Sequence, residues 1–548
     1  MNVPLMLFAP IFAPALHDET KAIQGFCFLV VNIGSHMKRS TKLTAILVAL
    51  GFVTQSAFGQ ESAIPLENGT NTIGSVVGQD LAGVDEELKK LQEDVAELLK
   101  RTDANHAGLE KLTESLDKDD DDSDSADFEK DLKKNSESLE KVDGRVKKIE
   151  DKIGNLVRAG HSDATMKLSG RIHLDYWSFP QTDPTLFPLE GGDPQDTWFF
   201  RRMRFGVAGD ITEQLGYKIE MEFAGGADSQ FRDAFVSIDD LPYFNTVLIG
   251  NHKRPYGLDH LNSSRYNVFM ERPAIVESFN QDARRLGISS NGNTKDLKYN
   301  WRYGYWNQQI IQGTGGYRDD HYQGEFAGRF AATPWYDEVS GGRGYIHFAV
   351  SGSLGDPDGL SGNNQARYQS RPENRTSRRW IDTQRIDGAT HQYLGGLETV
   401  VNVGSLQVVG EYQMTTVDRR PGFGDDVNFN GGYVYVSYFL TGEHMPWDRE
   451  TGTLGRIHPI QNFFSVRNCD GCIDRGWGAW QLCARYSAAD LTDSDINGGI
   501  SRIWTMGANW YWNPYCRWQF NYQLGDVERA PTGFGDFKAI GMRFMVDF

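Results

Sequence analysis

Long apolar segments are almost absent from this chain of 548 residues, whose mean hydropathy is −0.50. The one long apolar run lies near the N-terminus, at residues 43–53, and it is too short to span a bilayer as a stable helix. This scarcity excludes a bundle of transmembrane helices. It does not exclude a membrane β-barrel, because strands that alternate between apolar and polar residues average out in a hydropathy window.

Cysteine is also scarce. The chain has five cysteines, and only Cys469 and Cys472 lie close together, in the sequence NCDGC. The sequence has no second CxxC and no His pair nearby, so a zinc site is not expected. It also lacks the thioredoxin-like βαβ context that a redox motif would need. We expect a loop disulfide between these two cysteines, formed in an oxidising compartment.

The motifs of common enzymes and nucleic-acid-binding proteins are missing as well. We find no HExxH or HxxxH pattern, no GxSxG nucleophile elbow and no Walker phosphate loop. The acidic run at residues 117–127 lacks the glycine and the spaced ligands of an EF-hand. The net charge of −18 argues against a nucleic-acid-binding patch. We therefore expect no enzyme activity, no cofactor, no metal and no nucleic-acid partner.

The N-terminal region reads as a targeting segment followed by a linker. Residues 37–59 have a positive start, the apolar core at 43–53 and a cleavage site of small residues at 57–59, which is the pattern of a secretory signal peptide. Because 36 residues precede it, we interpret residues 1–36 as an extension from a mis-assigned start codon. Residues 60–83 form a polar linker.

A coiled coil is predicted at residues 84–157. Apolar residues recur there with alternating steps of four and three, which places them on one narrow face of a helix. The acidic run 117–127 separates two registers, and we interpret it as a hinge. A single amphipathic helix that packs on the following domain is the alternative.

From Met166 onward the pattern is that of β-strands. Residues 166–177, 215–223 and 297–305 alternate between apolar and polar side chains, with Tyr and Trp frequent on the apolar face and charges on the polar face. A soluble β-sandwich would also alternate. Apolar faces with aromatic ends and charged opposite faces are, however, typical of a membrane barrel, whose polar face lines the lumen.

The last ten residues have the length and pattern of one barrel strand. One face of residues 539–548 is wholly apolar: Ile540, Met542, Phe544, Val546 and Phe548. This ending resembles the C-terminal signature of bacterial outer-membrane barrels, in which a final Phe closes the ring. Residues 166–548 provide enough chain for about 16 antiparallel strands around a water-filled lumen. Polar inserts at 182–197 and 355–379 are expected to be extracellular loops or constrictions inside the lumen.

Arginine dominates the cations of this region. Residues 166–548 contain 31 Arg and 6 Lys, and Arg is the side chain suited to bidentate contact with oxyanions. Arg171, Arg202 and Arg204 fall on the polar phase of the first two strands, whereas Arg201 falls on the opposite phase. We expect the first three to face the lumen.

Several long segments resemble the phosphate-selective porins of the O and P type. They include FRRMRFG and the stretch that starts VLIGNHKRPYG, and the similarity is collinear over most of 166–548; the segments lie at 200–206, 247–273, 433–443, 476–491 and 507–522. The resemblance implies an outer-membrane porin, often with a short periplasmic coiled coil before the barrel. It also places part of the pore constriction at Lys253 and Arg254. One departure is that the family's Gly-x-Phe-Lys reads Gly-Asn-His-Lys here.

Together, the residues and the resemblance predict an outer-membrane pore for passive diffusion of small anions, with phosphate or polyphosphate favoured, through a lumen lined by Arg and Lys. The expected anion contacts are Arg171, Arg202, Arg204, Lys253, Arg254, Ser263, Ser264 and Arg265. We expect a homotrimer in contact with outer-membrane lipids, with the coiled coil in the periplasm.

Three alternatives stay open. The arginines could brace the wall through lumen carboxylates instead of binding anions. The pore could be general or cation-preferring, if Glu220, Glu222 and Asp233 line its narrowest point. The coiled coil could also tether the outer membrane to peptidoglycan, with the barrel as an anchor.

Overall fold

The computed structural model describes residues 164–548, apart from 226–228, 282–283 and 465–475. The predicted N-terminal extension, signal peptide, linker and coiled coil lie outside the described residues, as does the acidic hinge. So do Cys469 and Cys472, and their disulfide stays a prediction.

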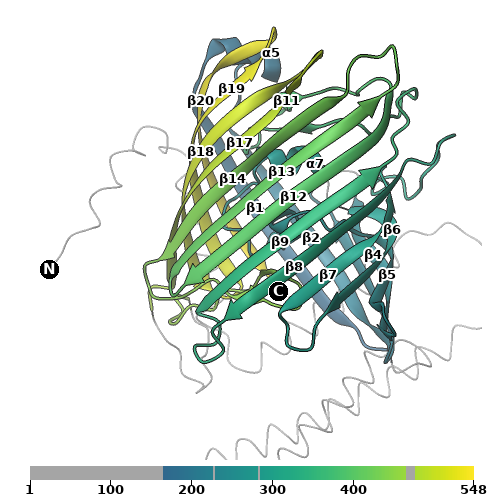
Figure 1. Ribbon diagram of the computed structural model, residues 1–548. Coiled ribbons are helices and arrows are strands. Elements are labelled where there is room, and N and C mark those ends of the chain that lie inside the picture. The colour runs from purple at the N-terminus through teal and green to yellow at the C-terminus, as the bar shows by residue number, and fades with distance from the viewer. Residues whose placement is uncertain (1–163, 226–228, 282–283, 465–475) are drawn as a thin grey trace, which may run out of the picture. The chain divides into compact units, whose positions relative to one another are not determined.

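Sixteen antiparallel strands form one closed barrel, in which each strand pairs with its neighbours in chain order and the last pairs with the first (Figure 1). The strand number confirms the prediction of about 16. The strands are β1 (Lys167–Thr182), β2 (Thr197–Thr212), β3 (Leu215–Glu222), β4 (Gln230–Leu241), β5 (Asn245–Lys253), β6 (Arg284–Asn293), β7 (Tyr299–Asn307), β8 (Gly324–Tyr336), β9 (Gly344–Gly355), β12 (Ala389–Val403), β13 (Leu406–Arg419), β14 (Val427–Phe439), β17 (Ala479–Asp493), β18 (Ile496–Asn513), β19 (Cys516–Arg529) and β20 (Gly533–Asp547).

The three strand segments predicted from alternation are β1, β3 and β7, with one difference at a boundary. The third was expected from residue 297, but β7 begins at Tyr299. Leu297 has a φ of 55°, so it belongs to the turn before the strand, where the backbone is left-handed. Its apolar side chain nevertheless continued the alternating pattern in the sequence.

The C-terminus closes the ring as its pattern predicted. The backbone of Phe548 exchanges hydrogen bonds of 2.9 and 3.1 Å with that of Gly170 in β1. The Phe548 ring lies so close to Gly170 that a Cβ there would come within 2.3 Å of it. A larger residue at position 170 would therefore force the Phe548 ring to move away from the first strand.

Aromatic side chains mark both rims of the outer wall. At one rim, Trp480 stacks on Trp510 with 5.0 Å between ring centroids, and Trp518 lies 4.9 Å from Phe544 in the next two strands. At the other rim, Tyr176 lies 5.1 Å from Trp198. Apolar side chains fill the exposed positions between the rims, and this arrangement is that of a bilayer-spanning barrel.

The remaining elements are short and lie in the connections. Two small sheets pair β10 (Gln369–Ser370) with β11 (Ile381–Asp382), and β15 (Trp447–Asp448) with β16 (Thr453–Leu454). The helices are η1 (Pro184–Leu186), α5 (Phe187–Glu190), α6 (Leu258–Leu261) and α7 (Ala274–Phe279). None of the helices in the described part of the chain is long and apolar enough to cross a membrane.

The connections at the two ends of the barrel differ in length. We call the end reached by β1 the loop end, because it carries the connections 183–196, 254–283, 308–323 and 356–388. The other end, the turn end, has connections as short as 213–214 and 404–405. The polar inserts expected at 182–197 and 355–379 are confirmed as connections at the loop end. Connections at both ends depart from the pattern: the long connection 440–478 leaves the turn end, and the short connections 494–495 and 530–532 lie at the loop end.

Candidate functional site

The connection between β5 and β6 crosses the lumen, and we call residues 254–281 the constriction loop. Its one-turn helix α6 is held at both ends. Glu411, on β13 across the barrel, accepts hydrogen bonds from the backbone N–H groups of Leu258 (2.7 Å) and Asp259 (2.9 Å). Lys253 donates from Nζ to three carbonyl oxygens at the helix end, 2.8 to 3.0 Å away. A carboxylate at the N-terminus and an ammonium at the C-terminus both complement the helix dipole.

The second half of the constriction loop follows the inner wall of β17 to β20. Asn509 and Gln519 donate side-chain hydrogen bonds to the carbonyl oxygen of Val268, at 2.9 and 3.1 Å. Arg543 of β20 donates to the carbonyl oxygen of Met270 at 2.5 Å. Since these wall residues are buried, the loop satisfies polar groups that would otherwise lack partners.

Glu271 of the constriction loop lies between two arginines of the wall. Its carboxylate accepts from Arg201 of β2, at 2.7 and 2.9 Å, and from Arg543 of β20, at 2.8 Å. Burial alone would favour the neutral acid, but the adjacent Arg201 guanidinium holds the pKa of Glu271 well below its usual range. The loop is thus attached to the wall by a buried, charged group.

The expectation that Arg201 lies on the outward phase is wrong. A β-bulge shifts the register, so that His173 pairs with Arg202 while Leu174 pairs with Phe200. The extra residue turns both Arg201 and Arg202 into the lumen, because a bulge lets two consecutive residues oppose one. The simple alternation of the sequence could not reveal this.

The arginines predicted on the first two strands lie in a network with carboxylates. Arg171 forms an ion pair with Glu220 at 2.6 Å and donates to Ser264 Oγ at 2.9 Å. Arg204 forms an ion pair with Glu222 at 2.6 Å. Both contacts are those of wall bracing, and the bond to Ser264 also connects the wall to the constriction loop.

The other predicted anion contacts, near and within the constriction loop, also bond to groups of the protein. Arg254 forms an ion pair with Glu325 at 2.5 Å, and Arg265 forms one with Asp547 at 2.8 Å. The Ser263 hydroxyl accepts from the backbone N–H of Arg265 at 3.4 Å. With Lys253 on its three carbonyls, these residues hold the loop in place, and their contact with an anion stays a prediction.

Arg202 differs from the other predicted cations. Its side chain is only 5% exposed, and within the described residues no carboxylate lies within ion-pair distance. Its one hydrogen-bond contact is with His173 Nδ1 at 3.4 Å, and its Nε has no partner. His173 is fully buried, and its Nε2 is also without a partner. A buried guanidinium without a counter-ion is costly, so this position is suited to an incoming anion.

The connection 356–388, which we call the arginine loop, forms one side of the loop-end mouth. Arg371 and Arg375 border a cavity of about 510 Å³ together with Phe199 and the connection 183–196. Burial and the neighbouring Arg201 lower the pKa of Arg375 to about 10, and its guanidinium carbon lies 5.8 Å from the centre of the Phe199 ring. No sequence motif assigned these arginines a role, although they are dense in the segment RPENRTSRR at residues 371–379.

A second feature that the sequence analysis missed is the inward course of residues 440–464, which we call the turn-end insert. Leu454 donates from its backbone N–H to Asn262 Oδ1 of the constriction loop at 3.0 Å. Trp447 donates to Thr333 Oγ1 at 3.2 Å, and Arg329 to the carbonyl oxygen of Gly452 at 2.9 Å. The insert thus narrows the barrel from the turn end and meets the constriction loop.

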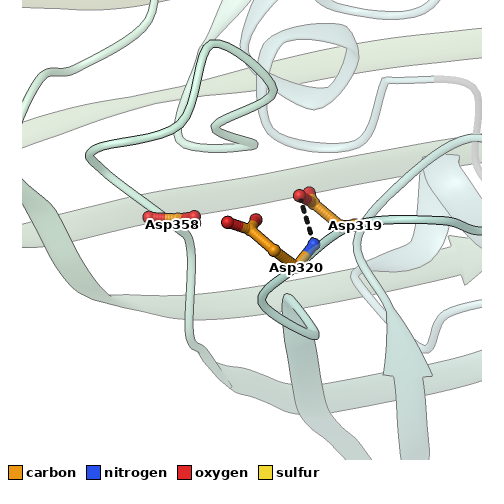
Figure 2. A group of neighbouring side chains, drawn as sticks. All are labelled: Asp319, Asp320 and Asp358. Carbon is orange, nitrogen blue, oxygen red and sulfur yellow. Dashed lines mark hydrogen bonds between the residues drawn. The ribbon is translucent and has the colours of Figure 1, made fainter.

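Three carboxylates gather at the loop end, away from this constriction. The carboxylate oxygens of Asp319, Asp320 and Asp358 lie within 4.8 Å of one another (Figure 2). Asp319 accepts hydrogen bonds from the Asp320 backbone N–H at 3.0 Å and from Gln323 Nε2 at 2.8 Å. Oxygen ligands of this kind suit Ca²⁺, but Asp320 is exposed and the cluster alone assigns no ion.

The family's sequence model, described as phosphate-selective porin O and P, matches residues 166–548. The chain belongs to this family. A relative from Caulobacter vibrioides, described only as an uncharacterized protein, is 26% identical over 408 residues, which cover 70% of this chain and 74% of the relative.

Solved porin structures are similar at low sequence identity. An anion-selective porin from Comamonas acidovorans is 14% identical, and the match covers 70% of this chain and all of that structure with a TM-score of 0.44. The channel DcaP of Acinetobacter baumannii is 12% identical over 71% of this chain and 99% of that structure, with a TM-score of 0.43. The trimer form of Vibrio cholerae OmpT is 11% identical. The match covers 70% of this chain and 99% of that structure, with a TM-score of 0.43.

Membership of the porin family and the closed barrel agree. This porin is an outer-membrane protein, and its loops and wall arginines meet inside the barrel. Family and fold are those of channel-forming proteins.

Proposed function

We propose that this porin lets small anions diffuse passively across the outer membrane, with phosphate and polyphosphate favoured, through a lumen lined by Arg and Lys. The observation that carries the proposal is Arg202, a buried guanidinium at the constriction without a carboxylate partner among the described residues. An oxyanion that reaches Arg202 would gain charge-assisted hydrogen bonds there. Its other contacts must stay weak enough for release.

The charges of the adjoining wall support an anion preference. Three carboxylates of this wall, Glu220, Glu222 and Asp233, face five cations, which are Arg171, Arg204, Lys218, Arg232 and Arg284. Each of these carboxylates lies within ion-pair distance of at least two of the cations. A cation-preferring pore needs carboxylates that are free to attract cations, so this charge balance argues against that alternative.

Two arginines at the mouth support the anion preference, and they share the cavity with three carboxylates, Glu190, Asp193 and Asp196. Arg371 and Arg375 line the cavity at the loop end, and the charge of Arg201 is close enough to influence that of Arg375. Arg202 follows Arg201 in β2. A route from the mouth to the constriction would therefore pass along positive side chains, which lowers the barrier for anions.

The assembly proposed with this function is a homotrimer. Its secreted chains would carry periplasmic coiled coils that bundle three arms below three pores. The heptad pattern of residues 84–157 supports the arms. An envelope tether that binds peptidoglycan would use the same arms, and a deletion experiment in the Discussion separates the two roles.

The zero-current potential of the purified porin in a planar bilayer under a KCl gradient tests the proposal. We expect the sign of the zero-current potential to indicate that anions permeate more readily than cations. We also expect added phosphate to block the chloride current. A potential of the opposite sign, or a current that ignores phosphate, would contradict the anion and phosphate assignments but leave the barrel unaffected.

A further inference from the structure

A second polar cavity lies beside the constriction loop. It has a volume of about 200 Å³ and is bordered by Phe279 and Gln281 of the constriction loop, by residues 365–369 and Arg385 of the arginine loop, and by Gln392 of β12. It shares no lining residue with the cavity at the mouth, and Arg202 does not border it. Segments that are far apart in the sequence therefore build a separate site.

The cations that line this cavity differ in how they are neutralised. Arg254 is paired with Glu325, and Arg367 forms a bidentate ion pair with Asp382, at 2.9 and 2.6 Å. Arg285 donates to the backbone carbonyl oxygens of Gln308 at 2.7 Å and Gln281 at 2.9 Å. Arg385 is exposed and forms no hydrogen bond or ion pair with any other described residue. Its charge is thus available to a ligand. Burial and the neighbouring Arg367 lower the pKa of Arg385, as expected for a cation without a counter-ion.

Glutamine side chains supply most of the remaining polar lining. They are Gln281, Gln308, Gln365, Gln369 and Gln392. Some of their amides bond to each other: Gln369 donates to Gln281 at 3.0 Å, and Gln392 donates to Gln308 at 2.7 Å. Each NH₂ group carries a second hydrogen, and each amide oxygen has two lone pairs. The lining can therefore both donate to a ligand and accept from it.

Aromatic rings form an apolar part of the same lining. Phe279 and Tyr368 meet edge to face, with 5.3 Å between ring centroids, and Ile310 also borders the cavity. The Tyr368 hydroxyl donates to Gln392 Oε1 at 2.9 Å. Because that bond fixes the ring, one apolar surface lies beside the row of amides.

We propose that this cavity binds a small hydroxylated organic anion, such as a monosaccharide acid. The carboxylate of the ligand would pair with Arg385, its hydroxyl groups would bond to the glutamine amides, and the apolar face of its ring would lie on Phe279 or Tyr368. Inorganic phosphate at neutral pH carries only one or two hydroxyl donors and has no apolar face, whereas a sugar acid has several hydroxyls that both donate and accept and a ring face that can lie on the aromatic rings. The inference rests on the proposed function, since the ligand must enter through the anion-conducting lumen.

Current block in planar bilayers tests the proposal with the full chain. Glucuronate is compared with glucose, which has the hydroxyls without the charge, and with acetate, which has the charge without the hydroxyls. We expect glucuronate to block half of the current at a concentration about tenfold lower than either, because glucose lacks the charge-assisted bond to Arg385 and acetate lacks the hydroxyl bonds to the glutamine amides. Arg385→Gln should remove this preference. Arg378→Gln, which removes an exposed arginine of the same loop that does not line the cavity, should keep it.

Each outcome decides between the two proposals. Equal block by glucuronate and acetate, or equal behaviour of the two variants, would overturn the sugar-acid site, even in a pore with the potential of an anion channel. A pore with the potential of a cation channel that still prefers glucuronate, and loses this preference in Arg385→Gln, would overturn the proposed anion selectivity but retain the site.

Discussion

At the scale of single residues, partner chemistry separates the cations of the lumen. Arg171, Arg204 and Arg254 have carboxylate partners. Removal of one of these arginines would leave its buried partner carboxylate without that ion pair. Arg202 has no such partner among the described residues. Replacing Arg202 therefore removes a positive charge that is available to an anion and leaves no carboxylate unpaired.

The substitution Arg202→Gln tests this distinction. We expect the concentration of phosphate that blocks half of the chloride current to rise about tenfold, because one charge-assisted hydrogen bond to the anion is lost. The measurement is current block in a planar bilayer at fixed ionic strength. Arg502→Gln, on the outward face of β18 where Arg502 pairs with Asp526, is the matched control and should leave the block unchanged. Equal effects of both variants would contradict a binding role for Arg202.

Glu271 predicts how the pore depends on pH. Since the pKa of Glu271 is held well below its usual range, the stabilisation from its ion pairs is fully present above the pKa of about 4.3 of a free glutamate. It is lost only as the pH falls through the lower pKa of the folded state. The ion pairs of Glu271 should thus contribute no change in single-channel current noise between pH 8 and pH 5.

The variant Glu271→Gln separates this charge from other effects of acid. It should show increased noise already at pH 8, since neither Arg201 nor Arg543 retains its ion pair with the loop. A wild-type change centred between pH 6 and 7, or a quiet Glu271→Gln pore at pH 8, would argue against this role of the ion pairs.

At the scale of elements, helix α6 depends on contacts outside itself. An isolated helix of four residues is not stable in water, because nucleation costs more than its few hydrogen bonds return. Glu411 and Lys253 bind its two ends from different strands. The position of α6 across the lumen therefore depends on side chains from β5 and β13.

Without the Glu411 carboxylate, helix α6 should no longer be held at its N-terminus, and the constriction loop should become more mobile. In Glu411→Ala the N–H groups of Leu258 and Asp259 lose their acceptor, at a cost of roughly 1–3 kcal/mol for each buried group that finds no water. We expect higher and noisier single-channel conductance, with the β-sheet circular dichroism spectrum unchanged. The control Gln407→Ala lies on the same strand but bonds to Tyr345 and Tyr435 of the wall. Unchanged conductance in Glu411→Ala would show that other contacts fix the loop.

At the scale of the whole molecule, closure by β20 and the inward loops make the barrel a filled structure instead of an open tube. The arginine loop holds the constriction loop through Glu373, which accepts from the backbone N–H of Ala274 at 2.9 Å and pairs with Arg485 of the wall. The turn-end insert meets the constriction loop from the other end. The permeation path is thus decided by three connections together.

Deletion of residues 84–157 tests the proposed role of the N-terminal arms. If the arms bundle three chains, the deletion should lower the fraction of trimers in native gel electrophoresis and leave the single-pore conductance unchanged. If they tether the envelope, the trimer fraction should persist while cells leak periplasmic protein. A deletion variant that retains both its trimers and the cell envelope would contradict both roles.

Much of the architecture could be predicted from the sequence because it depends on short-range periodicity. Alternation with a period of two identified β1, β3 and β20, the length of the region gave about 16 strands, and the final Phe indicated how the ring closes. The resemblance placed part of the constriction at Lys253 and Arg254, where the connection that crosses the lumen begins. These features need only the local backbone geometry and the preference of outward side chains for the bilayer.

The chemistry inside the lumen was decided only by the tertiary structure. Three features depend on which side chains meet across the barrel. They are the bulge that turns Arg201 inward, the use of Lys253 to hold α6, and the lack of a carboxylate partner for Arg202 among the described residues. The sequence gives the phase of each residue along its strand. Whether a cation is neutralised depends on a carboxylate that can lie hundreds of residues away, as Asp175 does for Arg543, and only the closed ring brings the two together.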